Sequence, residues 1–303
     1  MTYQMPEMSS IDWKTLKIAI VGGDEREQEI ARLAVETGAN VSVFGFPIEK
    51  DGLTEATISK TATESIKDAD FILFPIPGMS QDGSLFSNEK IYPDQAMLSG
   101  AKSDAHIIMG LPHPNLTEVC QKLDLRLHEY ETDKELMMLR MPSIVELALK
   151  IIIENTKVSI HGSSIVVIGQ GNVAHTLTRN LILLGANVTV AARNSVQRAQ
   201  AIVIGAKAIT LDKLGDAVTD CDICLSSVPA LLITKEVIDL MPKSIFIADF
   251  AAPPGGVDFN YARSKNINCV WARGLGRRAP ITVGRSQWKG IAERIIAIVK
   301  ERK

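Results

Sequence analysis

A glycine-rich turn between an apolar run and a helical pattern is the feature that most constrains the fold of this chain. The run 165–168 is apolar, as in a strand buried on both faces, and the turn GQGNVA at 169–174 follows it. The first glycine permits the tight turn, the second lets a pyrophosphate approach the backbone, and the small last residue lets a helix pack on the strand. Because the helix N-terminus also carries a partial positive charge, the pattern predicts dinucleotide binding. We expect the phosphates at Gly169, Gly171, Asn172, Val173 and Ala174; the alternative is a tight turn without a ligand.

The second strand of this pattern, at 188–191, is followed by Ala-Arg-Asn-Ser. An acidic residue at the end of this strand would bind the 2′-hydroxyl of NAD and repel a 2′-phosphate. Arg193 offers a charged donor fork instead, and Asn194 and Ser195 offer further donors. We therefore expect these three residues to bind the 2′-phosphate of NADP. The alternative is that Arg193 is a solvated loop residue.

The chain carries the same strand–turn–helix–strand pattern a second time near its start. The stretches KIAIVGGD at 17–24 and TGANVSVFG at 37–45 parallel SIVVIGQGN at 164–172 and LGANVTVAA at 184–192. Strands that alternate with helices predict parallel sheets, and 303 residues are enough for two domains. The predicted fold is therefore α/β, with two Rossmann-like, doubly wound parallel-sheet domains that face a cleft. The expected domains are 1–141 and 142–285, with a C-terminal helix, 286–303, that crosses back and packs on the first.

The turn of the first unit differs from that of the second in its charge. Gly22-Gly23 is followed by Asp24, Glu25 and Glu27, and the second and third small residues of the pattern are missing. These carboxylates would put negative charge where a pyrophosphate has to lie. We therefore assign the first unit to a substrate or partner and expect the cofactor only in the second.

A nearly apolar helix is expected over 143–155, with Ser143 as its N-cap.

Two further strand ends of the second unit are expected near the cofactor, because ligands of such folds bind at the carboxyl ends of the strands. The strand expected at 223–228 ends at Ser227 and Val228, with Pro229 after it, and these residues should touch the nicotinamide ribose. The segment DFAAPPGG at 249–256 ends the next strand on the same rim, and a plain turn is the alternative for it.

The composition is that of an ordinary globular protein, with 46% hydrophobic and 22% charged residues. A net charge of −2 gives no reason to expect nucleic acid or an anionic membrane as a partner. No apolar run is as long as a membrane span, and the first residues lack the apolar core of a signal peptide, so we expect a cytoplasmic protein. Cys221 and Cys224 are three apart on an expected strand and point to opposite faces, so we expect reduced, buried thiols and no metal.

The sequence assigns no catalytic acid or base. The histidines end at His175, which excludes the late-chain histidine that D-2-hydroxy acid dehydrogenases use on a similar two-unit layout. His113 follows the carboxyl end of an expected strand at 105–110 and is the candidate for contact with a substrate; the alternative is a surface loop histidine. The helix after it is expected to be capped by Asn115 or Thr117.

A segment rich in arginine and glycine, RGLGRRAPITVGR at 273–285, is the candidate substrate loop. Glycines permit close approach of a ligand, and arginine forks bind carboxylates through two hydrogen bonds. A substrate with two carboxylates would suit this loop, with Arg277 or Arg278 holding one of them. The alternative is a solvated basic turn.

The whole chain resembles the A subunits of dipicolinate synthases. The matching stretches are, in order, KIAIVGGD at 17–24, FSNEK at 86–90, a proline-bearing segment at 140–146, SIHGS at 159–163, LGANVTVAAR at 184–193, PPGGVDF at 253–259 and a GL…AP.T.G pattern over 274–284. The chain departs from the usual family pattern at LRMPS, 139–143, and at GLGR, 274–277. The resemblance implies NADP-linked oxidation of a dihydrodipicolinate-type ring to pyridine-2,6-dicarboxylate. It also implies a role in spore formation and a second, flavoprotein-like subunit.

These observations predict an NADP-dependent oxidoreductase with a small dicarboxylate substrate. We expect a homo-oligomer without nucleic acid, membrane or metal ligands that works with a flavoprotein-like partner subunit. One alternative is another NADP-dependent dehydrogenase or reductase on the same scaffold, which product analysis would separate. A second alternative is an NADP-binding regulatory subunit that needs its partner for the chemistry, because no acid–base pair stands out.

Overall fold

The computed structural model describes residues 4–48 and 53–302 and divides the chain into two compact units. The first unit comprises Met1–Arg140 and Ala279–Lys303, so far as these residues are described, and the second comprises Met141–Arg278. Each unit contains one six-stranded sheet whose neighbouring strands are all parallel. The predicted fold class, two Rossmann-like domains of the doubly wound type, is confirmed.

The first sheet has the strand order β3-β2-β1-β4-β5-β6. Its strands are β1 (Lys17–Val21), β2 (Asn40–Phe44), β3 (Thr57–Ile58), β4 (Phe71–Leu73), β5 (His106–Met109) and β6 (Arg126–Glu129). The helices of this unit are α1 (Glu25–Glu36), α2 (Ala62–Ile66), α3 (Gln95–Leu98), α4 (Pro114–Lys122) and α11 (Pro280–Glu301). The order reverses at β1, so the turn after β1 lies at the position where ligands of open α/β sheets bind.

The second sheet repeats this arrangement, in the order β12-β11-β10-β7-β8-β9. Its strands are β7 (Ser164–Ile168), β8 (Asn187–Ala191), β9 (Lys207–Ile209), β10 (Ile223–Ser226), β11 (Phe246–Asp249) and β12 (Asn268–Trp271). Its helices are α6 (Asn172–Leu183), α7 (Ser195–Val203), α8 (Leu214–Ala217), α9 (Lys235–Asp239) and α10 (Phe259–Ser264), and the long helix α5 (Lys134–Asn155) enters it from the first unit. The reversal point is β7, and the turn after it is the glycine turn of the sequence pattern.

The first strand of each sheet is buried on both faces, as its continuous apolar sequence predicts. Ile18 and Ile20 pack into one hydrophobic cluster of the first unit, whereas Ala19 and Val21, which point the other way, pack into another. In the second unit, Val167 and Val166 separate in the same manner. Helices therefore cover both faces of each sheet, and only the strand ends are left for a ligand.

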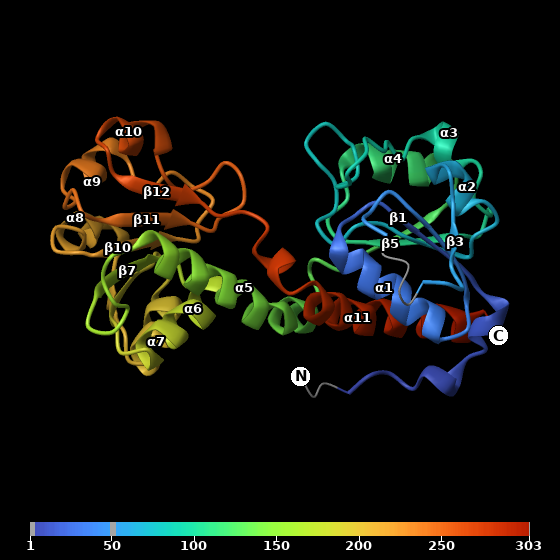
Figure 1. Cartoon of the computed structure of the whole chain (residues 1–303), viewed down its shortest axis with the longest axis horizontal. Coiled ribbons are helices and arrows are strands. Elements are labelled where there is room, and N and C mark those ends of the chain that lie inside the picture. Colours follow the sequence, from blue (N-terminus) through green and yellow to red (C-terminus); the bar gives the residue numbers. More distant parts are fainter. Residues whose placement is uncertain (1–3, 49–52, 303) are drawn as a thin grey trace. The chain divides into compact units, whose positions relative to one another are not determined.

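The C-terminal helix packs on the first unit, as predicted, but it begins at Pro280 instead of Ser286. In Figure 1 α11 runs beside α1, and the close approach depends on Gly284, where a Cβ would lie 2.7 Å from the carbonyl oxygen of Arg26. Trp288 of α11 is buried against Trp13, with ring centroids 5.9 Å apart. Residues 280–285, expected in the second domain, therefore belong to this helix.

Helix α5 also starts earlier than expected. It begins at Lys134 instead of after Ser143, and it continues through Pro142. Asp133 caps it, since its Oδ1 accepts hydrogen bonds from the backbone N–H groups of Glu135 (3.1 Å) and Leu136 (3.2 Å). The predicted cap at Ser143 is wrong, because a proline that usually marks a helix border lies inside this helix, where the chain tolerates the missing N–H.

Candidate functional site

The turn between β7 and α6 requires glycine at its first position for steric reasons. Gly169 has a positive φ of 92°, and a Cβ there would lie 2.6 Å from Ser227 Oγ and 2.7 Å from Val228 Cγ2. Its N–H donates to the carbonyl oxygen of Ala191 at the end of β8 (2.9 Å). An L side chain would be strained in this backbone conformation and would also clash, so Gly169 shapes the turn itself.

Gly171 differs from Gly169, because it lies beside open space and no atom of the described residues requires glycine there. Its φ of −72° suits any residue, and a Cβ there would meet no atom within 4 Å. Gly171 is the N-cap of α6, and no side chain caps this end of the helix. The buried side chain of Gln170 points elsewhere, toward His175 Nδ1 (3.3 Å). The first N–H groups of α6 therefore lack a side-chain acceptor beside a space that could hold an anion.

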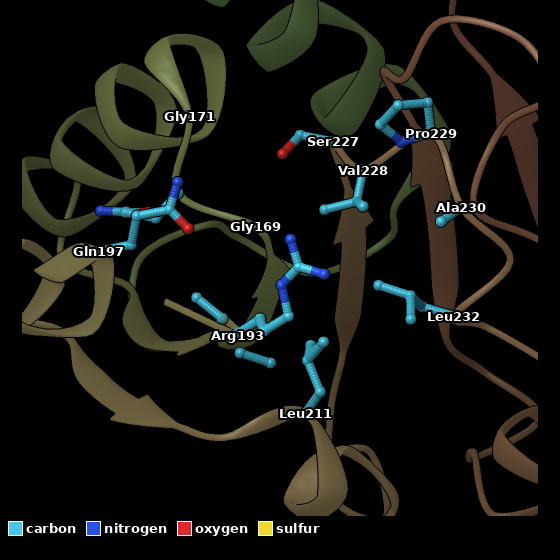
Figure 2. Close-up of a pocket in the computed structure, with 13 residues that line it drawn as sticks. Gly169, Gly171, Arg193, Gln197, Leu211, Ser227, Val228, Pro229, Ala230 and Leu232 are labelled. Atoms are coloured by element: carbon cyan, nitrogen blue, oxygen red, sulfur yellow. The ribbon is translucent and has the colours of Figure 1, made fainter. Parts of the chain in front are cut away.

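A cavity of about 430 Å³ lies beside this turn at the carboxyl ends of the strands (Figure 2). It brings together six of the residues named from the sequence: Gly169, Gly171, Arg193, Ser227, Val228 and Pro229. Residues that the sequence did not point to also line it: Gln170, Ala191, Ala192, Gln197, Leu211, Ala230 and Leu232. The lining contains no acidic side chain and one cation, Arg193.

The remaining cofactor candidates lie next to this cavity but not in its lining. Ala174 is buried against the core, so its small size serves the packing of α6 on the sheet. Asn194 is the N-cap of α7, and its Oδ1 accepts a hydrogen bond from the N–H of Val196 (2.8 Å). Ser195 is the first residue of α7, and Asn172 and Val173 begin α6. Contact of these residues with a cofactor stays a prediction.

Arg193 extends into the cavity from the loop after β8 (Figure 2). Within the described part of the chain, its guanidinium has no hydrogen-bond or ion-pair partner. The loop itself is fixed by Arg198, whose Nη1 donates to the carbonyl oxygens of Ala192 (2.8 Å) and Arg193 (2.7 Å). Sequence reasoning misses Arg198, because a residue that binds two backbone carbonyls leaves no motif. Its position one helical turn after the loop is the signal available.

The equivalent turn of the first unit is filled by the protein's own carboxylate. Glu27 stands at the helix position that Ala174 holds in the second unit, and it is only 2% exposed. Its Oε2 accepts a hydrogen bond from the N–H of Asp24 (2.7 Å), and its Oε1 accepts one from the N–H of Ile76 (2.7 Å). A Cβ on Gly23 would lie 2.3 Å from the carboxyl carbon of Glu27. The space in front of α1 is therefore occupied.

Two buried charges surround this carboxylate. Arg26 donates to Asp24 through Nε (2.8 Å) and Nη2 (2.7 Å), and both residues are buried. Burial raises the pKa of Glu27 from 4.5 to about 7, against the lowering influence of Arg26 and of the two N–H donors. Glu25, by contrast, is exposed on the same helical turn.

His113 has a local structural role in the first unit. It is the N-cap of α4, and its Nδ1 accepts a hydrogen bond from the N–H of Asn115 (3.3 Å). The prediction that Asn115 or Thr117 would cap this helix is wrong, because Pro114 occupies the first helical position and sets the cap one residue before it. The other ring nitrogen of His113 is left for another contact, so its proposed role toward a substrate stays a prediction.

The arginines of the segment 273–285 are divided between the two units. Arg273 lies over the ring of Trp271, 5.6 Å from its centroid. Arg277 and Arg278 end the short helix η4 (Leu275–Arg278) in the second unit, and Arg278 forms an ion pair with Glu146 of α5. Arg285 lies on α11 and pairs with Glu29 of α1 (2.7 Å) in the first unit. The segment is therefore not a single loop, and Arg285 serves the packing of the first unit.

The segment after β11 is built as a turn. Asp249 is fully buried, and its two oxygens accept hydrogen bonds from the N–H groups of Ala251 (2.9 Å) and Gly256 (2.6 Å). Burial raises the pKa of this carboxyl. Trp271 Nε1 donates to the carbonyl oxygen of Ala251 (3.0 Å). These bonds favour the plain-turn interpretation of 249–256.

Burial also raises the pKa of the thiols of Cys221 and Cys224, both of which are free. In the ranges 4–48 and 53–302 no three His, Cys, Asp or Glu residues gather as they would around a metal ion. No helix in those ranges is both long enough and apolar enough to cross a membrane.

Comparison with known proteins assigns the chain to a family. The model of the N-terminal domain of the dipicolinate synthase A subunit matches residues 17–131. Over 274 residues the chain is 32% identical to the dipicolinate synthase A subunit of Bacillus subtilis (strain 168), covering 89% of this chain and 92% of that protein. The chain belongs to the family of dipicolinate synthase A subunits. The resemblance inferred from the sequence motifs is thereby confirmed.

Solved structures of this family have the same fold. The A subunit of dipicolinate synthase from Bacillus subtilis superimposes with a TM-score of 0.83 at 30% identity, covering 94% of this chain and 97% of that one. The A subunit from Bacillus halodurans gives a TM-score of 0.82 at 29% identity, covering 93% and 98%. Both units of the family fold are therefore present here.

The second unit also matches a dehydrogenase family. The family of shikimate / quinate 5-dehydrogenases matches residues 148–269, which contain the glycine turn and Arg193. A transhydrogenase from Sinorhizobium meliloti shares the fold with a TM-score of 0.67 at 17% identity, covering 92% of this chain and 94% of that one. The family membership and the dehydrogenase match support a dehydrogenase-type role.

Proposed function

We propose that this protein is an NADP-dependent oxidoreductase, the A subunit of a dipicolinate synthase, that oxidises a dihydrodipicolinate-type ring to pyridine-2,6-dicarboxylate. The observation that carries the cofactor assignment is the cavity beside Gly171. It joins an uncapped helix N-terminus to an arginine that has no partner among the described residues. A pyrophosphate suits the helix N-terminus, and a 2′-phosphate suits the guanidinium fork. No acidic side chain lines the cavity to repel that phosphate.

The first unit supports this assignment, because its equivalent turn already holds an anion. Leu73 and Leu225 occupy equivalent places beside the first strand of each sheet. Ile76 lies three residues after Leu73, and Val228 lies three residues after Leu225. The N–H groups of Ile76 and Val228 therefore occupy equivalent positions in the two units. The N–H of Ile76 donates to the carboxylate of Glu27. We infer that the N–H of Val228 faces an oxygen of the cofactor in the same way.

The proposed oxidation needs little direct chemical participation by side chains. NADP, when bound, supplies a hydride acceptor. The ring must lose one hydride and one proton, and both losses together make it aromatic, so the substrate itself provides much of the driving force. The protein's main task is then to orient the ring and exclude water. The proton passes to solvent or to a group outside the cavity, because the lining offers no carboxylate, imidazole or amine.

The two carboxylates of the substrate need donors of their own. We assign Arg277 or Arg278 to one of them and keep His113 as a further contact. The ion pair between Arg278 and Glu146 does not oppose this role, because both side chains are about half exposed, at 44% and 53%. Exposed pairs contribute little free energy, so a substrate carboxylate can replace Glu146 as the partner of Arg278. A homo-oligomeric state, a cytoplasmic role in spore formation and a flavoprotein-like second subunit complete the proposal.

The reaction can be tested directly. The purified chain would receive NADP and the aldol product of aspartate semialdehyde and pyruvate, with and without the second subunit. We expect the ultraviolet absorbance of an aromatic dicarboxylate to rise in step with NADPH. A failure to form any aromatic product under either condition would refute the substrate assignment. The Gly171→Glu variant is the matched control, because it should fold but not take up NADP.

The absence of an acid or base in the cavity lining also favours a second candidate, an NADP-binding regulatory subunit. Under that function the chain alone would bind NADP but release no product, and the partner subunit would supply the chemistry. Turnover by the purified chain alone would exclude it.

A further inference from the structure

Glu27 occupies the place of a ligand in the first unit, and its contacts reach beyond its own helix. We propose that Glu27 is a positioning residue: its carboxylate holds the paired loops after β4 and β5 in place at the carboxyl edge of the first sheet, and its protonation loosens them. The inference rests on contacts within the first unit and does not depend on the proposed reaction.

The first step is the bond between helix and loop. Glu27 Oε1 accepts the N–H of Ile76, which lies 49 residues further along the chain, and Glu27 Oε2 accepts the N–H of Asp24. One carboxylate therefore joins the start of α1 to the loop after β4. Because the group is buried, water cannot replace either bond without opening the site.

The second step is the contact between the two loops, which touch backbone to backbone. A Cβ on Gly78 would lie 2.2 Å from the carbonyl oxygen of Leu111, and one on Gly110 would lie 2.1 Å from that of Ile76. The N–H of Gly110 donates to the carbonyl oxygen of Pro75 (3.3 Å). Neither loop can shift without the other, so the bond at Ile76 restrains both.

The third step leads to His113. The N–H of Met79, in the first of these loops, donates to the carbonyl oxygen of Leu111 (3.3 Å), and the N–H of His113 contacts the sulfur of Met79 (3.3 Å). His113 in turn begins α4 as its N-cap. This series of contacts therefore connects Glu27 to His113, the residue of the first unit that is proposed to contact a substrate.

Protonation is the variable that changes this restraint. The groups that face Glu27 are Asp24, the N-cap of α1, Arg26 in that helix and Tyr130 after β6. Arg140 and Glu131 act on Tyr130 in turn. Burial raises the pKa of Glu27 to about 7, so both of its forms are populated near neutral pH. A carboxylate accepts an N–H bond more strongly than the neutral acid does. Lowering the pH should therefore weaken the bond to Ile76.

The test is amide hydrogen exchange on the wild-type chain, followed by mass spectrometry or NMR. After correction for intrinsic exchange, the protection of the Ile76 amide should fall about five- to tenfold between about pH 8 and about pH 6, the size expected for the loss of charge assistance in one hydrogen bond. The amides at 109–111 should change in parallel, whereas those of β1 should not. Equal protection of Ile76 at both pH values would overturn the proposal.

A pair of variants separates Glu27 from its surroundings. Glu27→Gln should give the low protection at both pH values, because an amide cannot titrate and presents a donor to one of the two N–H groups. Glu25→Gln, on the exposed side of the same helical turn, should behave as the wild type. A wild-type pH response in Glu27→Gln would disprove the role of this carboxylate. If Glu27→Gln fails to fold, the pH series on the wild type decides alone.

The NADP affinity gives the readout that distinguishes positioning in the first unit from general damage. Fluorescence titration of NADPH should give the same Kd for wild type and Glu27→Gln, since the proposed cofactor cavity lies wholly in the second unit. A large loss of NADPH affinity would mean that the whole chain is disturbed and would count against the proposal. Failure of the proposed oxidation would leave the exchange result unaffected.

Discussion

Each of the two glycine turns follows the first strand of its sheet and leads into a helix. The two turns differ in what lies before that helix. In the first unit the carboxylate of Glu27 fills the space and accepts two backbone N–H bonds. In the second unit the equivalent residue is Ala174, and a Cβ on Gly171 would meet no atom within 4 Å. The helix N-terminus attracts an anion in both units. In the first unit Asp24 caps the helix and Glu27 fills the space before it, whereas Gly171 and Ala174 provide no such carboxylate in the second unit.

The two turns also differ in the partners of their backbone N–H groups. In the first unit the carboxylate of Glu27 connects α1 to the loop after β4 through its hydrogen bond with the N–H of Ile76. In the second unit no side chain of the described residues caps the first N–H groups of α6, so a ligand can use them. At two positions the first turn therefore has a carboxylate where the second has a small residue, with Asp24 in place of Gly171 and Glu27 in place of Ala174.

The largest effect is expected from filling the empty turn. Gly171→Glu should lower NADP affinity by more than about a hundredfold, because the new carboxylate would lie where the pyrophosphate has to lie and would repel it. The fold should be retained, since the φ of −72° suits glutamate and a Cβ meets nothing. Isothermal titration with NADP measures the affinity, and circular dichroism checks the fold.

Gly171→Ala is the matched control for that experiment and should bind NADP better than the glutamate variant, because a methyl group is smaller and adds no charge that repels the pyrophosphate. The same experiment tests the other half of the comparison. We predict that the first unit binds no dinucleotide, so tight binding that survives in Gly171→Glu would reveal a second site and overturn this assignment.

The next effect concerns the choice between NADP and NAD. Arg193→Glu should reverse the preference, with a loss of about ten- to a hundredfold for NADP, because one charged, bidentate contact to the 2′-phosphate is replaced by repulsion. NAD, which lacks this phosphate, should bind equally well or better. Titration of both cofactors gives the ratio. Arg179→Glu, an exposed site on α6, makes the same charge change and should leave the ratio intact. Equal affinities of the wild type for the two cofactors would contradict the role of Arg193.

The sequence is informative where a position is set by backbone geometry. Gly169 and Gly171 match a tight turn and an open approach, as predicted, because glycine patterns report the backbone directly. Arg198 belongs to no motif, since its partners are two carbonyl oxygens that any residue provides, and its place one helical turn after the loop is a weak signal. The charge of Glu27 is evident from the sequence, but its bond to Ile76 depends on which loop the fold brings to it.

The predicted helix borders fail for a related reason. Pro142 is typical of a helix start, yet α5 passes through it because Asp133 provides a cap further upstream. The start of α11 at Pro280 is hidden in a segment whose arginines suggest a ligand loop. Caps and pairs formed with distant residues decide these borders, and local composition does not report them.

A smaller effect is expected from replacing Arg278. Unlike Arg193, Arg278 already has a carboxylate partner, Glu146. Arg278→Ala should lower kcat/KM for the dicarboxylate by about tenfold and leave NADP affinity almost unchanged, and the same is expected for Arg277→Ala if that residue holds the carboxylate instead. Lysine in either place should rescue only in part, because it lacks the fork. Glu146→Gln breaks the same ion pair but keeps the guanidinium, so it should not reduce turnover. Normal kinetics in both arginine variants would place the carboxylate donors elsewhere.

The smallest expected effect separates two roles of His113 in the first unit. His113→Ala removes the N-cap of α4 and should lower the free energy of unfolding by about 0.5–1 kcal/mol. His113→Asn keeps a side-chain oxygen that can accept the N–H of Asn115, so it should restore stability. If the imidazole also contacts the substrate, both variants should raise its KM by about threefold, since neither offers the ring nitrogen. Urea unfolding and steady-state kinetics on the same preparations measure the two effects independently. Normal KM values in His113→Asn would show that the residue serves the helix alone.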